Sequence, residues 1–150
     1  MQVFPMANAL KELTDVLGGP QTLGRSVHTR SDLMDFVREG FPFEVLESVI
    51  RLTNMTREEV ETLIALPART LTRRKQAKHL QPVESDRLFR VARVAAHAIA
   101  VLGSPQKAAQ WLHRANRGLG GNSPITYLDT DIGAEQVNDI LTRLEHGVVG

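Results

Sequence analysis

Apolar residues recur along this chain at the three- and four-residue spacing that places them on one face of an α-helix. The clearest case is residues 84–103, where Leu88, Val91, Ala95 and Leu102 belong to one broad apolar stripe. Valine, isoleucine and aromatic residues never alternate with polar residues for long, so no strand is predicted. We predict an all-α protein of roughly eight helices, among them residues 31–40, 42–52, 56–66 and 84–103, a basic helix from about 68, a helix after 104, a short piece at 123–128 and a last helix from about 131 to 147.

Start and stop signals bound several of these helices. Thr56 is followed three residues later by Glu59, which is the pattern of a capping box. Ser31 is the predicted N-cap of the helix at 31–40. Gly103 is a stop signal, and the Ser104–Pro105 pair after it is a new start, because proline is favoured at the first helical position.

The composition is that of an ordinary soluble globular protein, with 150 residues of which 42% are hydrophobic and 23% are charged. This length suits one domain, or two small domains that share a core. The chain has no cysteine, which excludes a disulfide framework and a thiolate metal site. Its start lacks the basic and apolar regions of a secretory signal, and no apolar run approaches the roughly 20 residues that span a bilayer. We therefore expect a cytoplasmic protein.

Positive charge is concentrated in residues 69–79, RTLTRRKQAKH, which hold five Arg and Lys residues and no acid, although the net charge of the chain is only +1. After the capped segment at 56–66 and a short break, this stretch fits the second helix of a helix-turn-helix. Arginine suits guanine, Gln76 could read adenine, Lys and Thr suit phosphates, and Leu71 would face inward. The alternative is a solvated basic helix end, which the helix dipole also favours. The capped helix and the tight turn favour DNA binding.

Signatures of an enzyme are absent from the sequence. None of the five histidines lies in a metal-binding spacing, and His97 is expected to be packed in its alanine-rich helix. The segment RGLGGNSP has neither of the glycine patterns that cradle nucleotide phosphates, so its glycines are expected to permit a sharp turn. No isolated carboxylate pair suggests acid–base chemistry, although a pair formed in space stays open. We predict no catalytic activity, no metal and no cofactor.

The region after Gly103 is slightly acidic and does not extend the basic patch. It holds the only tryptophan, Trp111, and the only tyrosine, Tyr127, two residue types that are enriched in interface hot spots. Trp111 could equally fill the core of the C-terminal helices. The final residues, EHGVVG, place two valines on a tail that either packs against another surface or frays.

Several motifs together resemble a known family. They are GRSVHTRSDLMDFVREGFP, RTLTRRK, ESDRLFRVARV and WLHRANRGLGGNSPITYLDTDIGAEQVNDILTRLEHGVV, and they cover nearly everything from about Leu23 onward. The chain resembles the Xre/MbcA/ParS antitoxins of RES-Xre toxin–antitoxin operons. This resemblance implies an N-terminal helical extension at 1–22, an Xre-like helix-turn-helix domain at 23–83, a connecting or dimerisation helix at 84–103 and a small helical toxin-binding domain at 104–150.

The resemblance also implies which residues act. The residues expected to contact DNA are Arg69, Thr70, Thr72, Arg73, Arg74, Lys75 and Lys78. The residues expected to contact the toxin are Trp111, Asn116, Leu119, Gly120, Gly121, Ser123, Pro124, Glu145, His146, Gly147, Val148, Val149 and Gly150. The chain departs from the family where Ala65 replaces a frequent glycine in the turn and Pro67 replaces a frequent serine N-cap.

The function that the resemblance implies is that of a bacterial antitoxin. It would bind a RES-domain toxin that degrades NAD+, block the toxin's active site, and repress its own operon as a homodimer, alone or with the toxin. One alternative is a stand-alone helix-turn-helix regulator with a C-terminal dimerisation domain. Another is a scaffolding or partition-associated protein, because some members of the family carry that name.

Overall fold

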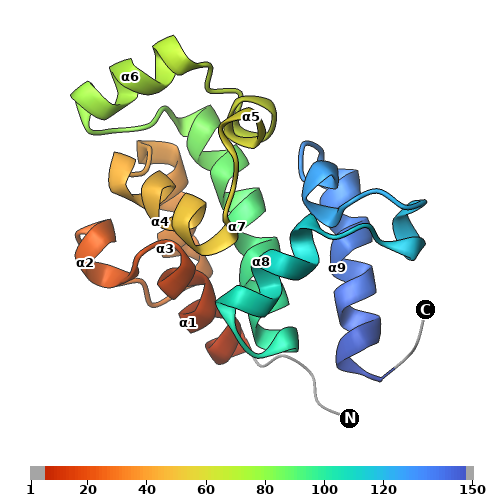
Figure 1. Cartoon of the computed structure of the whole chain (residues 1–150). Helices are drawn as coiled ribbons and strands as arrows, with labels where there is room; N and C mark the ends of the chain where they lie inside the picture. The colour runs from red at the N-terminus through yellow and green to blue at the C-terminus, as the bar shows by residue number, and fades with distance from the viewer. Residues whose placement is uncertain (1–5, 148–150) are drawn as a thin grey trace.

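The structure, a computed structural model, describes residues 6–147 and consists of helices joined by short turns (Figure 1). The elements are α1 (Met6–Val16), α2 (Gly19–Leu23), α3 (Arg30–Glu39), α4 (Phe43–Thr53), α5 (Arg57–Glu59), the π-helical turn η1 (Val60–Ile64), α6 (Ala68–Ala77), α7 (Pro82–Leu102), α8 (Pro105–His113), the 3-10 turns η2 (Arg117–Leu119) and η3 (Pro124–Tyr127), and α9 (Asp131–Glu145). Within residues 6–147 the only extended pairing is a single bridge between Pro42 and His79. The prediction of an all-α protein is confirmed.

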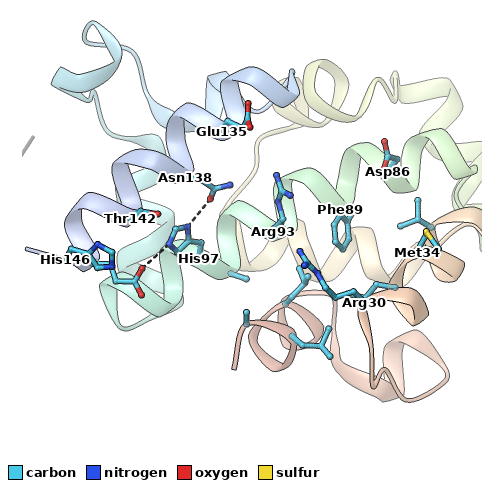
Figure 2. A pocket seen from close by; sticks show the side chains of 17 residues that line it. Arg30, Met34, Asp86, Phe89, Arg93, His97, Glu135, Asn138, Thr142 and His146 are labelled. Atoms are coloured by element: carbon cyan, nitrogen blue, oxygen red, sulfur yellow. Dashed lines mark hydrogen bonds and ion pairs between the residues drawn. The ribbon is translucent and has the colours of Figure 1, made fainter. Parts of the chain in front are cut away.

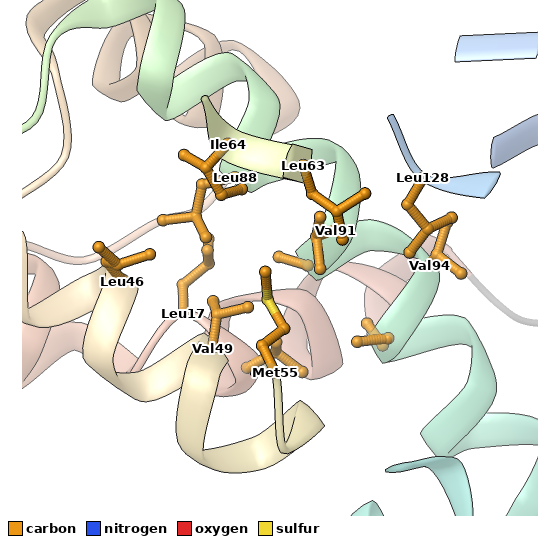
Figure 3. Packing of buried hydrophobic residues seen from close by; sticks show 14 of the residues in the cluster. Leu17, Leu46, Val49, Met55, Leu63, Ile64, Leu88, Val91, Val94 and Leu128 are labelled. Atoms are coloured by element: carbon orange, nitrogen blue, oxygen red, sulfur yellow. The ribbon is translucent and has the colours of Figure 1, made fainter. Parts of the chain in front are cut away.

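Helix α7 runs through the middle of the molecule, with α1 to α4 on one side and α8 and α9 on the other (Figure 1). Its apolar stripe is buried as predicted, and Leu88, Val91 and Val94 are each 0% exposed. The same hydrophobic cluster includes Val49 of α4 and Leu128 of the C-terminal part (Figure 3). One continuous core therefore joins the N-terminal and C-terminal halves of the described chain.

The N-cap of α3 is Thr29, so the prediction of Ser31 was wrong. The Asp32 backbone N–H donates to Thr29 Oγ1 at 3.1 Å, and the Asp32 carboxylate accepts from the N–H groups of Thr29 at 3.0 Å and His28 at 2.8 Å. These backbone hydrogen bonds lower the pKa of Asp32, because they stabilise its charged form. Three residues after Ser31 stands Met34, which cannot return such a bond, and this favours the earlier cap.

The predicted helix at 56–66 begins as expected and ends differently. Thr56 and Glu59 form the predicted capping box, with the Glu59 N–H donating to Thr56 Oγ1 at 3.1 Å and the Thr56 N–H donating to Glu59 Oε1 at 2.8 Å. After one α-helical turn the chain widens into η1 and stops at Ala65, which adopts a left-handed conformation with φ 60°. That residue turns the chain so that α6 begins at Ala68, directly after its N-cap Pro67.

The segment after α6 is fastened to the junction of α3 and α4. The Leu80 N–H donates to the Phe41 carbonyl at 2.9 Å, and the Phe41 N–H donates to Ser85 Oγ at 2.8 Å. Gly40 has φ 92°, and a Cβ at this position would overlap the Leu80 carbonyl oxygen. Only glycine fits so close an approach. The end of α6 is thereby held in place although no residue of α6 itself is buried.

Candidate functional sites

Helix α6 lies at one end of the molecule, away from α9 (Figure 1). Of the residues expected to contact DNA, the exposed ones are Arg69, Thr72, Arg73, Lys75 and Lys78. Thr70 is half-buried, and its hydroxyl accepts a long contact of 3.5 Å from Arg73 Nη2. Leu71 packs against the core, as predicted for the inner face of the helix. The exposed side of α6 therefore presents cations to solvent.

Arg74 differs from its neighbours, because its guanidinium is bound by a buried acid. Arg74 Nε donates to both carboxylate oxygens of Glu84, at 2.8 Å and 3.1 Å. The Arg74 side chain is 19% exposed and that of Glu84 is 7% exposed. This hydrogen bond raises the pKa of Arg74 above its ordinary value. The pair joins α6 to the start of α7, where Glu84 Oε1 also accepts from the Gln81 N–H at 2.8 Å.

The glycine-rich segment 116–122 forms a compact loop around Asn116. Asn116 Oδ1 accepts from the Gly118 N–H at 2.9 Å, the Asn116 N–H donates to the Asn122 carbonyl at 3.0 Å, and the Asn116 carbonyl accepts from the Gly121 N–H at 2.9 Å. Gly120 and Gly121 are exposed and adopt φ values of 66° and 87°. The predicted sharp turn is confirmed, and the left-handed conformation explains the glycines.

Apolar side chains anchor this loop to the body of the protein. Leu119 is 4% exposed and Pro124 is buried, while Ser123 is half-buried. The Tyr127 hydroxyl donates to the Leu119 carbonyl at 3.1 Å. Trp111 is half-buried and packs against the core, so it contributes to the core and still leaves part of its ring exposed.

The other residues expected to contact the toxin lie at the far end of α9. Glu145 is half-buried, whereas His146 and Gly147 are exposed. His97 of α7 packs against α9. Its Nδ1 lies 3.0 Å from Asn138 Oδ1, and its Nε2 lies 3.6 Å from Glu145 Oε1 (Figure 2). The predicted tail residues Val148, Val149 and Gly150 are outside the described residues. The described residues of the expected toxin-binding set are thus divided among α8, which holds Trp111, the glycine loop with the start of η3, and the end of α9.

A histidine of α8 reaches the first helix of the helix-turn-helix. His113 Nε2 lies 2.9 Å from Glu59 Oε1, and His113 Nδ1 lies 3.0 Å from the Ala109 carbonyl oxygen. Both partners are acceptors, so both contacts are satisfied only by the doubly protonated ring. Burial lowers the pKa of His113, but the hydrogen bonds to Glu59 and Ala109 outweigh burial and raise it above the ordinary value.

Sequence reasoning missed the Arg74–Glu84 and His113–Glu59 pairs, because each pair joins side chains of different helices. A partial signal for Glu84 exists, since Gln81 stands three residues before it in the spacing of a capping box. In the part of the chain that the structure describes, no group of three or more His, Asp or Glu side chains is arranged to hold a metal ion. Within that part, no helix is both long enough and apolar enough to cross a membrane.

Comparison with known proteins gives two matching family models. The Antitoxin Xre-like helix-turn-helix domain matches residues 32–93, and the Antitoxin Xre/MbcA/ParS C-terminal toxin-binding domain matches residues 97–147. A curated protein named Antitoxin Xre from Yersinia enterocolitica serotype O:8 / biotype 1B is 36% identical over 118 residues, which are 77% of this chain and 80% of that protein. The chain belongs to the Xre antitoxin family.

Two more Xre antitoxins support this assignment. The protein of that name from Photorhabdus laumondii subsp. laumondii is 31% identical over 131 residues, 86% of this chain and 88% of its own length. The one from Pseudomonas putida is 34% identical over 122 residues, 81% of this chain and 72% of its own length. This member of the family therefore has a helix-turn-helix domain followed by a toxin-binding domain, as the resemblance implied.

The two family domains meet inside a single helix. One family model ends at residue 93 and the other begins at residue 97, and both positions fall within α7. The helix-turn-helix domain and the toxin-binding domain of this chain therefore share α7 and its core. The domain limits expected at 23–83, 84–103 and 104–150 stay predictions.

Proposed function

We propose that this Xre antitoxin neutralises a RES-domain toxin by covering the active site in which that toxin degrades NAD+, and that it represses its own operon in the bacterial cytoplasm. The observation that carries the proposal is the exposed, internally hydrogen-bonded loop at 116–122 within the matched toxin-binding domain. A loop whose backbone is already ordered loses little conformational entropy when a partner binds. Inhibition of this kind requires no chemistry from the antitoxin itself.

A glycine-to-asparagine pair tests the contact of this loop with the toxin. Gly121 has φ 87° and Gly103 has φ 97°, and an added Cβ meets nothing within 4 Å at either position. Asparagine tolerates left-handed backbone better than most residues, so both variants should fold. We expect Gly121→Asn to release NAD+ loss and growth arrest when antitoxin and toxin are co-expressed, because its side chain projects from the loop. Gly103→Asn, outside the loop, is the matched control and should still neutralise the toxin.

The tail from His146 to Gly150 is the second part of the proposed inhibitory surface. Deletion of residues 146–150 should restore NAD+ degradation in the same co-expression assay. Complete neutralisation by both the deletion and Gly121→Asn would contradict the proposed mode of inhibition. Failure of the antitoxin to co-purify with an NAD+-degrading enzyme would contradict the proposed partner.

For operon repression we propose that α6 contacts DNA through Arg69, Arg73 and Lys75, which are exposed. Replacing Arg73 by alanine should weaken operator binding and reduce the magnitude of its log–log salt slope by about 0.9 for each phosphate that is no longer neutralised. Arg51→Ala is a suitable control, because Arg51 is exposed on α4 and lies outside α6. An unchanged operator affinity for a double Arg69→Ala and Arg73→Ala variant would contradict the assignment.

Repression by a helix-turn-helix commonly requires two recognition helices on two operator half-sites. We therefore include in the proposal that two antitoxin chains associate as a homodimer.

A further inference from the structure

A groove lies between α1 and α3 on one side and α9 on the other, with α7 along its floor (Figure 2). It encloses about 1010 Å³ and contains neither α6 nor the glycine loop. Its apolar lining comes from Leu10 and Leu13 of α1, Leu33 of α3, and Phe89 and Ala96 of α7. A hollow of this size and character is typical of a surface that receives apolar side chains from a partner.

The wall of the groove also carries an apolar side chain that points away from the core. Met34 of α3 lines the groove and is 46% exposed, and Val37, one turn further along α3, is half-buried. One surface thus offers both a hollow and an exposed side chain able to fill such a hollow. A two-fold interface between identical chains requires this combination, because each chain must supply both halves of the contact.

The charges along the groove are of both signs. Arg30 and Arg93 are positive, Asp86 and Glu135 are negative, and all four side chains line the groove and are exposed. Among the residues that the structure describes, none of these four forms an ion pair. A partner of one charge sign, such as nucleic acid, would meet like charge at half of these positions. A second copy of the chain supplies an opposite charge for each of them.

From this geometry we infer that the groove is the surface on which a second copy of the antitoxin docks, with Met34 of each chain entering the groove of the other and the arginines of each chain facing the acids of the other. The inference rests on the proposed association of two antitoxin chains and names the surface that they use. It leaves α6 of each chain free for DNA and the loop at 116–122 free for the toxin, whereas Glu145 and His146 line the groove and would lie at the interface between the two copies.

Sedimentation velocity of the full chain tests the role of Met34. Met34→Glu should raise the dimer dissociation constant by at least about tenfold, because it places an unpaired charge in an apolar contact. Ile132→Glu is the matched control, since Ile132 is 70% exposed on α9 and does not line the groove, and it should leave the constant unchanged. Thermal unfolding of both variants checks that they are folded. A monomeric wild-type chain, or an equal effect of the two substitutions, overturns the inference.

A charge-exchange experiment separates a second copy from any other occupant. One variant carries Arg30→Glu and Arg93→Glu, and the other carries Asp86→Lys and Glu135→Lys. Each variant alone should be monomeric, because these four positions then carry charges of a single sign, whereas an equimolar mixture should form a heterodimer. Persistent homodimers, or a mixture that stays monomeric, would overturn the docking of a second copy. Native mass spectrometry would also overturn the docking of a second copy if it showed a monomeric wild-type chain that retains a small apolar compound.

The toxin assay keeps this inference distinct from the proposed function. Met34→Glu should still neutralise the toxin in co-expression, because Met34 is not part of the toxin-binding domain. Loss of the dimer with neutralisation retained supports the groove as the dimer surface. Loss of neutralisation together with the dimer would mean that the toxin uses the groove, which Glu145 and His146 also line, and this would overturn the assignment of the groove to a second copy alone.

Discussion

The contact between His113 and Glu59 predicts a pH-dependent link between the toxin-binding part and the helix-turn-helix. The two residues are 54 positions apart, and their side chains are 29% and 19% exposed. Hydrogen bonds to charged groups contribute about 1.5–3 kcal/mol, and partial exposure screens the pair, so we expect a coupling energy of about 1–1.5 kcal/mol. Removing this pair should therefore lower the melting temperature by about 2–4 °C.

The pH dependence follows from the direction of the pKa shift. The pKa of His113 is raised in the folded protein, because the hydrogen bonds to Glu59 and Ala109 favour the charged ring. The link therefore contributes fully below the unfolded histidine pKa of about 6.5, and its contribution is lost as the pH rises through the folded-state pKa. Above that pH the ring keeps one proton and satisfies only one of its two acceptors.

The assay is a double-mutant cycle with His113→Ala and Glu59→Gln, measured by urea unfolding at pH 6 and at pH 8.5. Glutamine retains an oxygen that can accept the Thr56 N–H, so the capping box of α5 is disturbed little. We expect a coupling energy at pH 6 that shrinks at pH 8.5. His79→Ala, which removes an exposed imidazole that has no Glu59 contact, is the control for loss of a histidine side chain. A coupling energy near zero at pH 6, or one that is the same at both pH values, would refute this reasoning.

Three further substitutions test the packing described above. Ala65→Gly should raise the free energy of unfolding by about 0.5–1 kcal/mol in urea, because Ala65 is held at φ 60°; a decrease would show that the alanine is not strained. Glu84→Gln should cost about 1.5–3 kcal/mol of stability and also weaken operator binding in a gel shift, since it releases Arg74. Loss of an acid would by itself strengthen DNA binding, so tighter binding would contradict a positioning role for Glu84. Leu128→Ala should cost about 2–5 kcal/mol and leave a single unfolding transition, because the two halves share one core; two separate transitions would show that the halves unfold independently.

The role of Arg74 cannot be predicted from its position along α6. It stands among the cations of a basic recognition helix, and neither charge nor motif distinguishes it from Arg73. In the folded chain Arg73 is exposed, whereas Arg74 is bound by the buried Glu84. We therefore expect Arg74→Ala to reduce operator binding through the placement of α6, with a measurable loss of stability that Arg73→Ala does not share.

Local chemistry was enough to predict the helices from residue 31 onward, the Thr56–Glu59 capping box, the turn into α6 and the glycine loop, whereas α1 and α2 were not predicted from the pattern of residues. Each of these depends on residues a few positions apart, whose hydrogen bonds and apolar spacing can be read along the chain. Ser31 is a good N-cap residue type, but so is Thr29, and the hydrogen bond from the Thr29 N–H to the Asp32 carboxylate completes a capping box only at Thr29. The left-handed Ala65 was not predicted, because alanine gives no local signal for that conformation.

The contacts on which the proposals rest depend on elements distant in the sequence. The groove requires α1, α3, α7 and α9 to assemble, and its balance of charge combines residues from Arg30 to Glu135. The His113–Glu59 contact requires α8 to pack beside the helix-turn-helix. Periodicity shows which face of a helix is apolar, but it does not show which other helix covers that face. In the described chain α7 packs against α1, α3, α4, α8 and α9, and an apolar groove remains open beside it.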